Sequence, residues 1–161
     1  MANQSWKELR RMNVNKKIDM KDCIFCKIID KEAPAEIICE TDSCLAFFPL
    51  RPATKGHTLV VPKRHVSDFT NAEPRFFGNL SSIAVEISKR LLMVYSPDGM
   101  NMITSAGQAA TQSVMHLHIH LVPRWAKDEM GEIWPSRQHT SPATLALWAD
   151  EFRTYVEGDR G

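Results

Sequence analysis

Histidines that alternate with aliphatic residues constrain this chain more than any other feature. The stretch 113–124 reads SVMHLHIHLVPR, with histidine at 116, 118 and 120 and aliphatic residues between them. Alternation with a period of two predicts a β-strand whose imidazoles share one face. Pro123 is expected to end this strand, because proline lacks the backbone donor. A lone histidine in a strand is usually structural. Three neighbouring rings are costly to desolvate unless a metal or an anion uses them, so we interpret the strip as a functional site.

Composition and charge narrow the class of protein. The chain has 161 residues, 43% of them hydrophobic, which is enough for one domain with a real core. Twenty basic residues oppose nineteen acidic ones, and this balance argues against a nucleic-acid or membrane-surface partner. No apolar run approaches a membrane span, and the N-terminus lacks a signal-type apolar region, so we expect a cytoplasmic protein. Four cysteines in a reducing compartment favour metal or redox chemistry over disulfides.

The remaining pattern predicts an α+β domain over residues 22–161, preceded by an N-terminal extension at 1–21 that is either a short helix or a disordered arm. Predicted strands are 35–40, 43–48, 57–61, 100–104 and the histidine stretch; predicted helices are 23–29, 74–95 and 142–156. We expect a five-stranded, mostly antiparallel sheet with helices packed on one side. The last helix should bury Leu145, Trp148, Phe152 and Val156.

Four segments, in order, carry a family resemblance. They are Cys-Ile-Phe-Cys-Lys-Ile-Ile from position 23, Leu-Ala-Phe from 45, Lys-Gly-His-Thr-Leu-Val-Val-Pro-Lys-x-His from 55 and Gln-Ser-Val-x-His-x-His-x-His from 112. Together they resemble the histidine triad (HIT) superfamily over about two-thirds of the chain, and the Cys-x-x-Cys is most similar to zinc-bearing bacterial HIT hydrolases of the Hint and Fhit type. The resemblance implies a homodimer whose two sheets join into one. It also implies hydrolysis or transfer at the α-phosphate of a nucleotide conjugate, through a nucleotidyl-histidine intermediate.

The chemistry of the strip can be argued beside that resemblance. A neutral imidazole is a good nucleophile at pH 7, and the central His118 matches the family's nucleophile. Its second ring nitrogen should donate to a backbone carbonyl. His120 is expected to donate a proton to a phosphate or bridging oxygen, as in the family. Ser113 and the amides around Gln112 either hold the phosphate oxygens or simply begin the strand. His57 is either a structural histidine or, through its Gly-His-x-Leu-Val match, a catalytic one.

Zinc is the expected cofactor. The Cys-x-x-Cys at 23–26 supplies half of a tetrahedral site, so two more ligands are needed. One candidate set adds Cys39 and Cys44, in the manner of a zinc ribbon. The family's zinc-bearing members instead imply His65 and His116, which we prefer because cysteine in a strand is commonly a small buried hydrophobe. Four protein ligands leave no open position, so the zinc would be structural.

Departures from the family pattern bear on the substrate. Pro49 stands where many relatives carry Asp or Asn to hold the ribose. Ser105 stands where they often carry Asn or Gln near the phosphates, and Gln108 is a candidate substitute in the same loop. Thr111 replaces a usual glycine. We therefore expect the protein to bind a nucleotide, and the sequence leaves its affinity and the identity of its base open.

Two further features concern the substrate. Phe25 and Phe47, with Ile28, form either an apolar slot for a base or ordinary core. Arg124 either reaches a distal phosphate or caps a solvated strand end.

The leading hypothesis is a nucleotide hydrolase that cleaves a nucleoside monophosphate from a phosphoramidate, acyl or polyphosphate conjugate. One alternative is a dinucleoside polyphosphate phosphorylase or nucleotidyltransferase, because the Pro-Arg-Trp at 123–125 resembles the same segment in phosphorylases of this superfamily. The other is a weakly active, nucleotide-binding regulatory module whose residues 125–140 face a partner. No membrane or specific nucleic-acid partner is expected.

Overall fold

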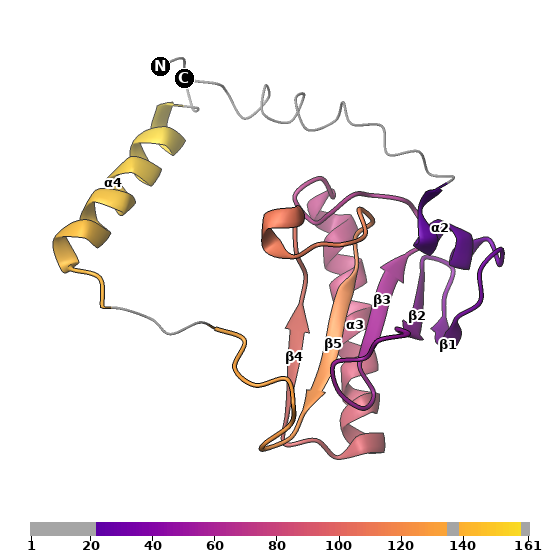
Figure 1. The fold of residues 1–161 in the computed structure, drawn as a ribbon. Coiled ribbons are helices and arrows are strands. Elements are labelled where there is room, and N and C mark those ends of the chain that lie inside the picture. Colours follow the sequence, from indigo (N-terminus) through magenta and orange to yellow (C-terminus); the bar gives the residue numbers. More distant parts are fainter. Residues whose placement is uncertain (1–21, 135–138, 159–161) are drawn as a thin grey trace. The chain divides into compact units, whose positions relative to one another are not determined.

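The computed structural model describes residues 22–134 and 139–158 (Figure 1). They belong to two compact units, one ending at Gly131 and one running from Glu132 to the C-terminus. In chain order the elements are α2 (Ile24–Ile29), β1 (Glu36–Glu40), β2 (Cys44–Phe48), β3 (Thr58–Pro62), α3 (Pro74–Tyr95), β4 (Gly99–Ile103), η2 (Gln108–Ala110), β5 (Ile119–Arg124) and α4 (Pro142–Gly158). The extension predicted over 1–21 lies outside the described residues.

The first unit is built on a five-stranded sheet with the order β1-β2-β3-β5-β4. Every neighbouring pair is antiparallel. The register places Leu59 of β3 opposite His120 of β5, and Ile103 of β4 opposite the same histidine. The predicted α+β class with an antiparallel five-stranded sheet is confirmed.

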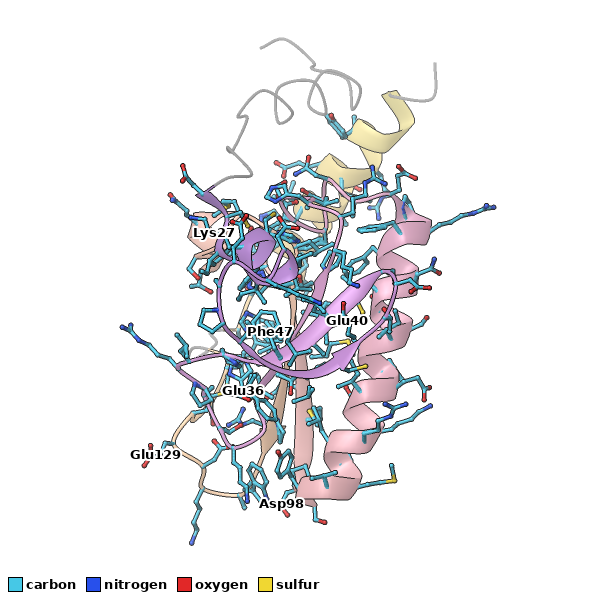
Figure 2. All side chains as sticks on the ribbon, turned by 90° about the vertical axis from the view of Figure 1, so that its right-hand side faces the viewer. Lys27, Glu36, Glu40, Phe47, Asp98 and Glu129 are labelled. Atoms are coloured by element: carbon cyan, nitrogen blue, oxygen red, sulfur yellow. The ribbon has the colours of Figure 1, made fainter. Side chains whose placement is uncertain are left out.

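β2 and β3 are almost completely buried, which means that the middle of the sheet is covered on both faces. Helix α3 presents the stripe Leu80, Ala84, Ile87 and Leu91, and this stripe packs with Ala46, Val60, Leu117, Ile119 and Leu121. The opposite cluster joins Phe25 and Ile28 of α2 to Leu45, Phe47, Leu59 and Val61. Figure 2 shows α3 on one side of the strands and α2, which carries Lys27, on the other.

The histidine strand differs from its prediction at both ends. β5 begins only at Ile119, because the Leu117 N–H donates to the carbonyl of Val66 (2.6 Å), which lies beyond β3. It also continues through Pro123 to Arg124. The Pro123 carbonyl accepts a hydrogen bond from Thr54 Oγ1 (2.6 Å), on the side where pairing with β3 has already ended. The missing N–H of Pro123 faces that same side, so the proline costs no ladder bond.

The second unit contains α4, which is described by itself. Ser141 caps it by accepting the Thr144 N–H (3.1 Å), and the proline at 142 stands in the first turn, as predicted. Leu145, Trp148 and Phe152 are 50, 56 and 69% exposed, so the predicted buried face is not formed among the described residues of this unit. The side chain of Val156 lies outside them. No helix within the described ranges is both long and apolar enough to cross a membrane.

Candidate functional site

Backbone groups determine which nitrogen of His118 carries a proton. Its Nδ1 lies 2.7 Å from the carbonyl oxygen of His116. A carbonyl can only accept, so Nδ1 is the donor and Nε2 keeps its lone pair. The carbonyl of His118 itself accepts from Thr104 Oγ1 (2.9 Å), which fixes the chain at the start of β5. The expected donation to a backbone carbonyl is therefore present.

A second chain of hydrogen bonds sets the proton on His120. The Ala53 N–H donates to Nδ1 of His57 (2.9 Å), so the hydrogen of this neutral ring must lie on Nε2. That nitrogen is 2.9 Å from Nδ1 of His120 and donates to it. The remaining nitrogen of His120, Nε2, is then a donor. On the strip, His118 therefore offers a lone pair and His120 a hydrogen-bond donor.

Burial keeps these rings neutral. It lowers the pKa of His57 and of His118 below the ordinary value for histidine. It also lowers the pKa of His120 to about 4, with smaller contributions from positive charge on His118 and His57. Neutral rings are what the assigned tautomers require near pH 7.

The three rings open onto one cavity of about 260 Å³. Its lining includes Ser105 and Ser113, and a contact between these serines and a phosphate stays a prediction. Thr111 also lines it, at a φ of 66°. That left-handed conformation explains why a glycine is natural at this position. Gln108 begins η2 and is exposed, and it is not among the lining residues.

Gln112 is buried and lines the cavity, but its side-chain amide is hydrogen-bonded to backbone groups. Oε1 accepts the Gly107 N–H (2.8 Å), and Nε2 donates to the carbonyls of Ser67 (2.7 Å) and Val114 (3.0 Å). Both amide hydrogens are thus committed. The side chain joins the loop before β5 to the segment after β3, and a contact between its amide and a substrate stays a prediction.

A compact cluster of possible metal ligands lies next to the His118 ring. It consists of Cys23, Cys26, His65 and His116, whose ligand atoms all lie within 4.8 Å of one another. Nδ1 of His116 is 3.4 and 3.6 Å from the two sulfurs, and Nδ1 of His65 is 3.3 Å from the sulfur of Cys26. Tetrahedral zinc with ordinary bond lengths separates a sulfur and a nitrogen ligand by about 3.5 Å. The set therefore fits zinc.

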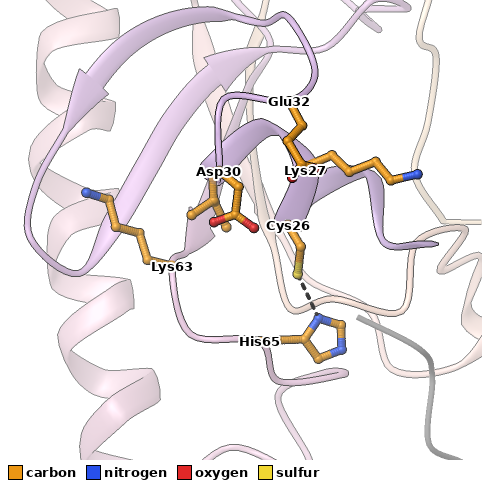
Figure 3. A pocket seen from close by; sticks show the side chains of 7 residues that line it. Cys26, Lys27, Asp30, Glu32, Lys63 and His65 are labelled. Atoms are coloured by element: carbon orange, nitrogen blue, oxygen red, sulfur yellow. Dashed lines mark hydrogen bonds between the residues drawn. The ribbon is translucent and has the colours of Figure 1, made fainter. Parts of the chain in front are cut away.

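The surroundings of this cluster support the fit. Nε2 of His116 donates to the carbonyl of Pro62 (2.9 Å), which leaves Nδ1 with the lone pair for a metal. Burial, then the hydrogen bond and charge of Cys23, raise the pKa of the Cys26 thiol to about 11, so a cation is needed to stabilise thiolates here. Figure 3 shows Cys26 and His65 facing each other in a pocket of about 520 Å³.

The alternative all-cysteine set is not assembled. Cys39 stands opposite Ala46 in the β1–β2 register, so it does not pair with Cys44. Both side chains instead belong to the cluster packed on α3. Neither is part of the donor cluster found among the described residues.

A second, apolar cavity of about 380 Å³ is lined by Phe25, Ile28, Phe47 and Pro49. Phe25 meets Phe47 edge to face at 5.7 Å and His118 at 5.2 Å between ring centroids. The two phenylalanines are therefore core residues and cavity wall at once, and Phe25 connects this cavity to His118.

Sequence reasoning missed several contributors. The Ala53 N–H and the Pro62 carbonyl are backbone groups. Every residue has a backbone carbonyl and every residue except proline has a backbone N–H, so residue identity does not indicate these contacts. Met130 lines the cavity of His57, His118 and His120 from the loop after β5, and nothing in the surrounding sequence indicates it. Arg124 was expected at a phosphate or a solvated end, but it bonds to Asp128 and Asn101.

Comparisons with known proteins agree with this geometry. Residues 30–127 match the family model described as HIT domain. An uncharacterized HIT-like protein of Borreliella burgdorferi is 40% identical over 114 residues, which is 70% of this chain and 82% of that protein. An Arabidopsis thaliana protein named adenylylsulfatase HINT3 is 33% identical over 119 residues, 74% of this chain and 60% of that protein.

Solved structures show the same fold. A Streptococcus mutans protein superposes with a TM-score of 0.80 at 34% identity, covering 88% of this chain and 89% of that one. A histidine triad family protein from Mycobacterium smegmatis, described as Zn-bound, superposes with a TM-score of 0.65 at 31% identity, covering 81% and 98%.

Proposed function

The chain belongs to the HIT (histidine triad) domain family, and on that premise we propose that it is a nucleotide hydrolase. It would release a nucleoside monophosphate from a conjugate by a covalent step at the α-phosphate. One observation carries the proposal. The ring of His118, which offers a lone pair, and the ring of His120, which offers an N–H, line one cavity with their centroids 4.8 Å apart. The role of His118 follows from its backbone hydrogen bond, and that of His120 from the hydrogen bond that the His57 ring donates to it.

The proposed reaction has two displacements. Nε2 of His118 attacks the α-phosphorus and forms a phosphorus–nitrogen bond, while the bond from phosphorus to the leaving group breaks. Nε2–H of His120 donates a hydrogen bond to the leaving atom or to a phosphate oxygen beside it, and the leaving group takes its proton from solvent. Water then attacks the nucleotidyl-histidine, releases a proton to solvent and restores His118. The sum is conjugate plus water giving nucleoside monophosphate plus the protonated leaving group. Ser113 and Ser105 are proposed to hold phosphate oxygens, and His57 to fix the tautomer of His120.

The nucleoside is proposed to occupy the apolar cavity beside Phe25 and Phe47. Its base would stack or pack against these rings, and Phe25 leads directly to His118. Pro49 lines the same cavity and offers no side-chain donor or acceptor, so the ribose is expected to be held less tightly than by an Asp or Asn. The name of the Arabidopsis relative, an adenylylsulfatase, supports an adenylyl group in this cavity.

Zinc is proposed as a structural ion held by the donor cluster. The Zn-bound description of the mycobacterial relative supports this choice of metal. When bound, zinc would tie α2 to the segment after β3 and to the residue that starts the histidine strip. No catalytic step depends on it, because four protein ligands fill its coordination.

A homodimer is proposed as well, in a cytoplasmic setting. β4 lies at one edge of the sheet and Met102 on it is 44% exposed, so a second copy has an open strand edge to meet. Light scattering on the purified chain tests this, and a monomeric mass at micromolar concentration would contradict it.

Trapping the intermediate tests the main proposal. Purified protein is mixed with adenosine 5′-phosphoramidate and with adenylyl sulfate, quenched in alkali and measured by intact mass. We expect an acid-labile adduct of one nucleotidyl group, absent in His118→Ala and present in the matched control His139→Ala, whose ring is exposed in the second unit. An adduct that persists in His118→Ala would refute the nucleophile. A parallel reaction with inorganic phosphate distinguishes hydrolysis from phosphorolysis by the product formed.

A further inference from the structure

We propose that Met130 determines leaving-group specificity, held in the catalytic cavity by an ion-pair clamp of Arg124 and Asp128. The cavity would then accept leaving groups with an alkyl portion in preference to anionic ones. This inference rests on the proposed function, because it assigns a substrate class to the same site.

The clamp is a two-point contact. The Asp128 carboxylate accepts from Nε (2.6 Å) and Nη2 (2.8 Å) of Arg124, the residue that ends β5. Nη1 of Arg124 donates to Oδ1 of Asn101 on β4 (2.8 Å), so the pair is anchored to two strands. A bidentate fork of this kind fixes orientation as well as distance. The guanidinium lowers the pKa of Asp128 to about 2, so the clamp stays charged at every pH where activity would be measured.

The same clamp holds the chain on both sides of Met130. The Met130 N–H donates to Oδ1 of Asp128 (3.1 Å), and Nη2 of Arg124 donates to the carbonyl of Gly131 (2.6 Å). The peptide group before Met130 and the one after Gly131 are thereby fixed. Its side chain lines the cavity that also contains His118 and His120.

The chemistry of that cavity sets the preference. Ile103, Val122 and Met130 give it an apolar wall, and among the described residues that line it none is a lysine or arginine. Arg124, which holds the loop that carries Met130, makes four hydrogen bonds to protein acceptors and is neutralised by Asp128. An anionic leaving group would lose water there without gaining a cation, whereas an alkyl group would gain apolar contact.

Two conjugates of matched size test the preference. Adenosine 5′-phosphoramidates of n-butylamine and of 3-aminopropanoate differ chiefly in the carboxylate. We expect wild type to favour the butyl conjugate at least tenfold in kcat/KM. Met130→Ala should reduce that ratio about fivefold, and Met130→Lys should reverse it. A ratio that stays within twofold of wild type in both variants would overturn the role of Met130.

The clamp is tested through Met130. Asp128→Asn should lower the butyl preference as much as Met130→Ala does, and should change it no further when combined with Met130→Ala. Asp150→Asn is the matched control, because it breaks an Asp–Arg pair with Arg153 on α4. Additive effects in the double variant, or equal losses for both conjugates in Asp128→Asn, would show that the clamp does not act through Met130.

Binding separates this inference from the proposed reaction. His118→Ala lacks the nucleophile, so calorimetry on it measures affinity for each conjugate without turnover. We expect His118→Ala to bind the butyl conjugate more tightly, and the additional change Met130→Ala to remove that difference in affinity. This result supports the inference even where wild type hydrolyses neither conjugate. Hydrolysis of both conjugates with equal affinities and equal rates would leave the proposed function standing and overturn the inference.

Discussion

Replacing Gln112 separates two roles for this residue. The sequence predicts a substrate contact, whereas the structure shows an amide that bonds three backbone groups and a side chain that is 3% exposed. Gln112→Ala removes all three bonds at once. The loop before β5 then loses its tie to the segment after β3.

The size of the effect follows from those bonds. Each neutral hydrogen bond contributes about 1 kcal/mol net, and more where its partner is left buried without a replacement. Three such bonds give about 3 kcal/mol, and the lost volume of a buried side chain adds to it. We therefore expect Gln112→Ala to lower the free energy of unfolding by about 3 to 4 kcal/mol. Gln112→Glu should lose at least as much at neutral pH, because its carboxylate would face two carbonyl oxygens.

Urea unfolding of the metal-loaded protein measures the change in the free energy of unfolding. A shift of the midpoint urea concentration with an unchanged m-value reports that change. Gln108→Ala is the matched control, since Gln108 lies in the same loop and is exposed; we expect a change below about 0.5 kcal/mol there. A Gln112→Ala protein as stable as the control, with a raised KM for nucleotide, would refute the structural role and restore the substrate contact.

Three other outcomes are expected. Gly56→Ala should destabilise by about 2 kcal/mol or more in the same assay, because Gly56 has a φ of +78° and an added Cβ would lie 2.6 Å from Cε2 of Tyr95; an unchanged midpoint would contradict this. Elemental analysis should find about one zinc per chain in Cys39→Ser and none in His65→Ala, and the reverse pattern would favour the all-cysteine site. Since burial lowers the pKa of His120 to about 4, the ring stays neutral as the pH falls through 6.5, so kcat/KM should fall only as the pH approaches 4; a decline centred near 6.5 would contradict it.

Much of the fold was predictable because local pattern and burial agree. The helical stripe from Leu80 to Leu91 and the strands at 44–48 and 58–62 lie close to where periodicity places them. The ends of the histidine strand were not predictable, since a strand begins and ends where its partners do. Leu117 bonds beyond β3, and Pro123 falls where that pairing has stopped.

The candidate site divides in the same way. Residue types and spacing indicate the rings and thiols, and the structure brings His65 and His116 to the two cysteines as the resemblance implies. The proton positions depend on the Ala53 N–H and on the carbonyls of Pro62 and His116, and side-chain identity says nothing about such groups. The loop that carries Met130 is bonded to the Arg124–Asp128 pair, and nothing in the spacing of these residues indicates that arrangement.

The division of labour among the three histidines therefore depends on the core as much as on the rings. Leu117, Ile119 and Leu121 are at most 1% exposed against α3, so their burial determines which face the histidines take. A shift of one residue in register would send the imidazoles into that core and the aliphatic side chains to the cavity. Because that shift would expose several buried aliphatic side chains at once, its free-energy cost fixes the register strongly. The nitrogen proposed to attack and the nitrogen proposed to donate are thus positioned by the buried aliphatic residues that alternate with the histidines.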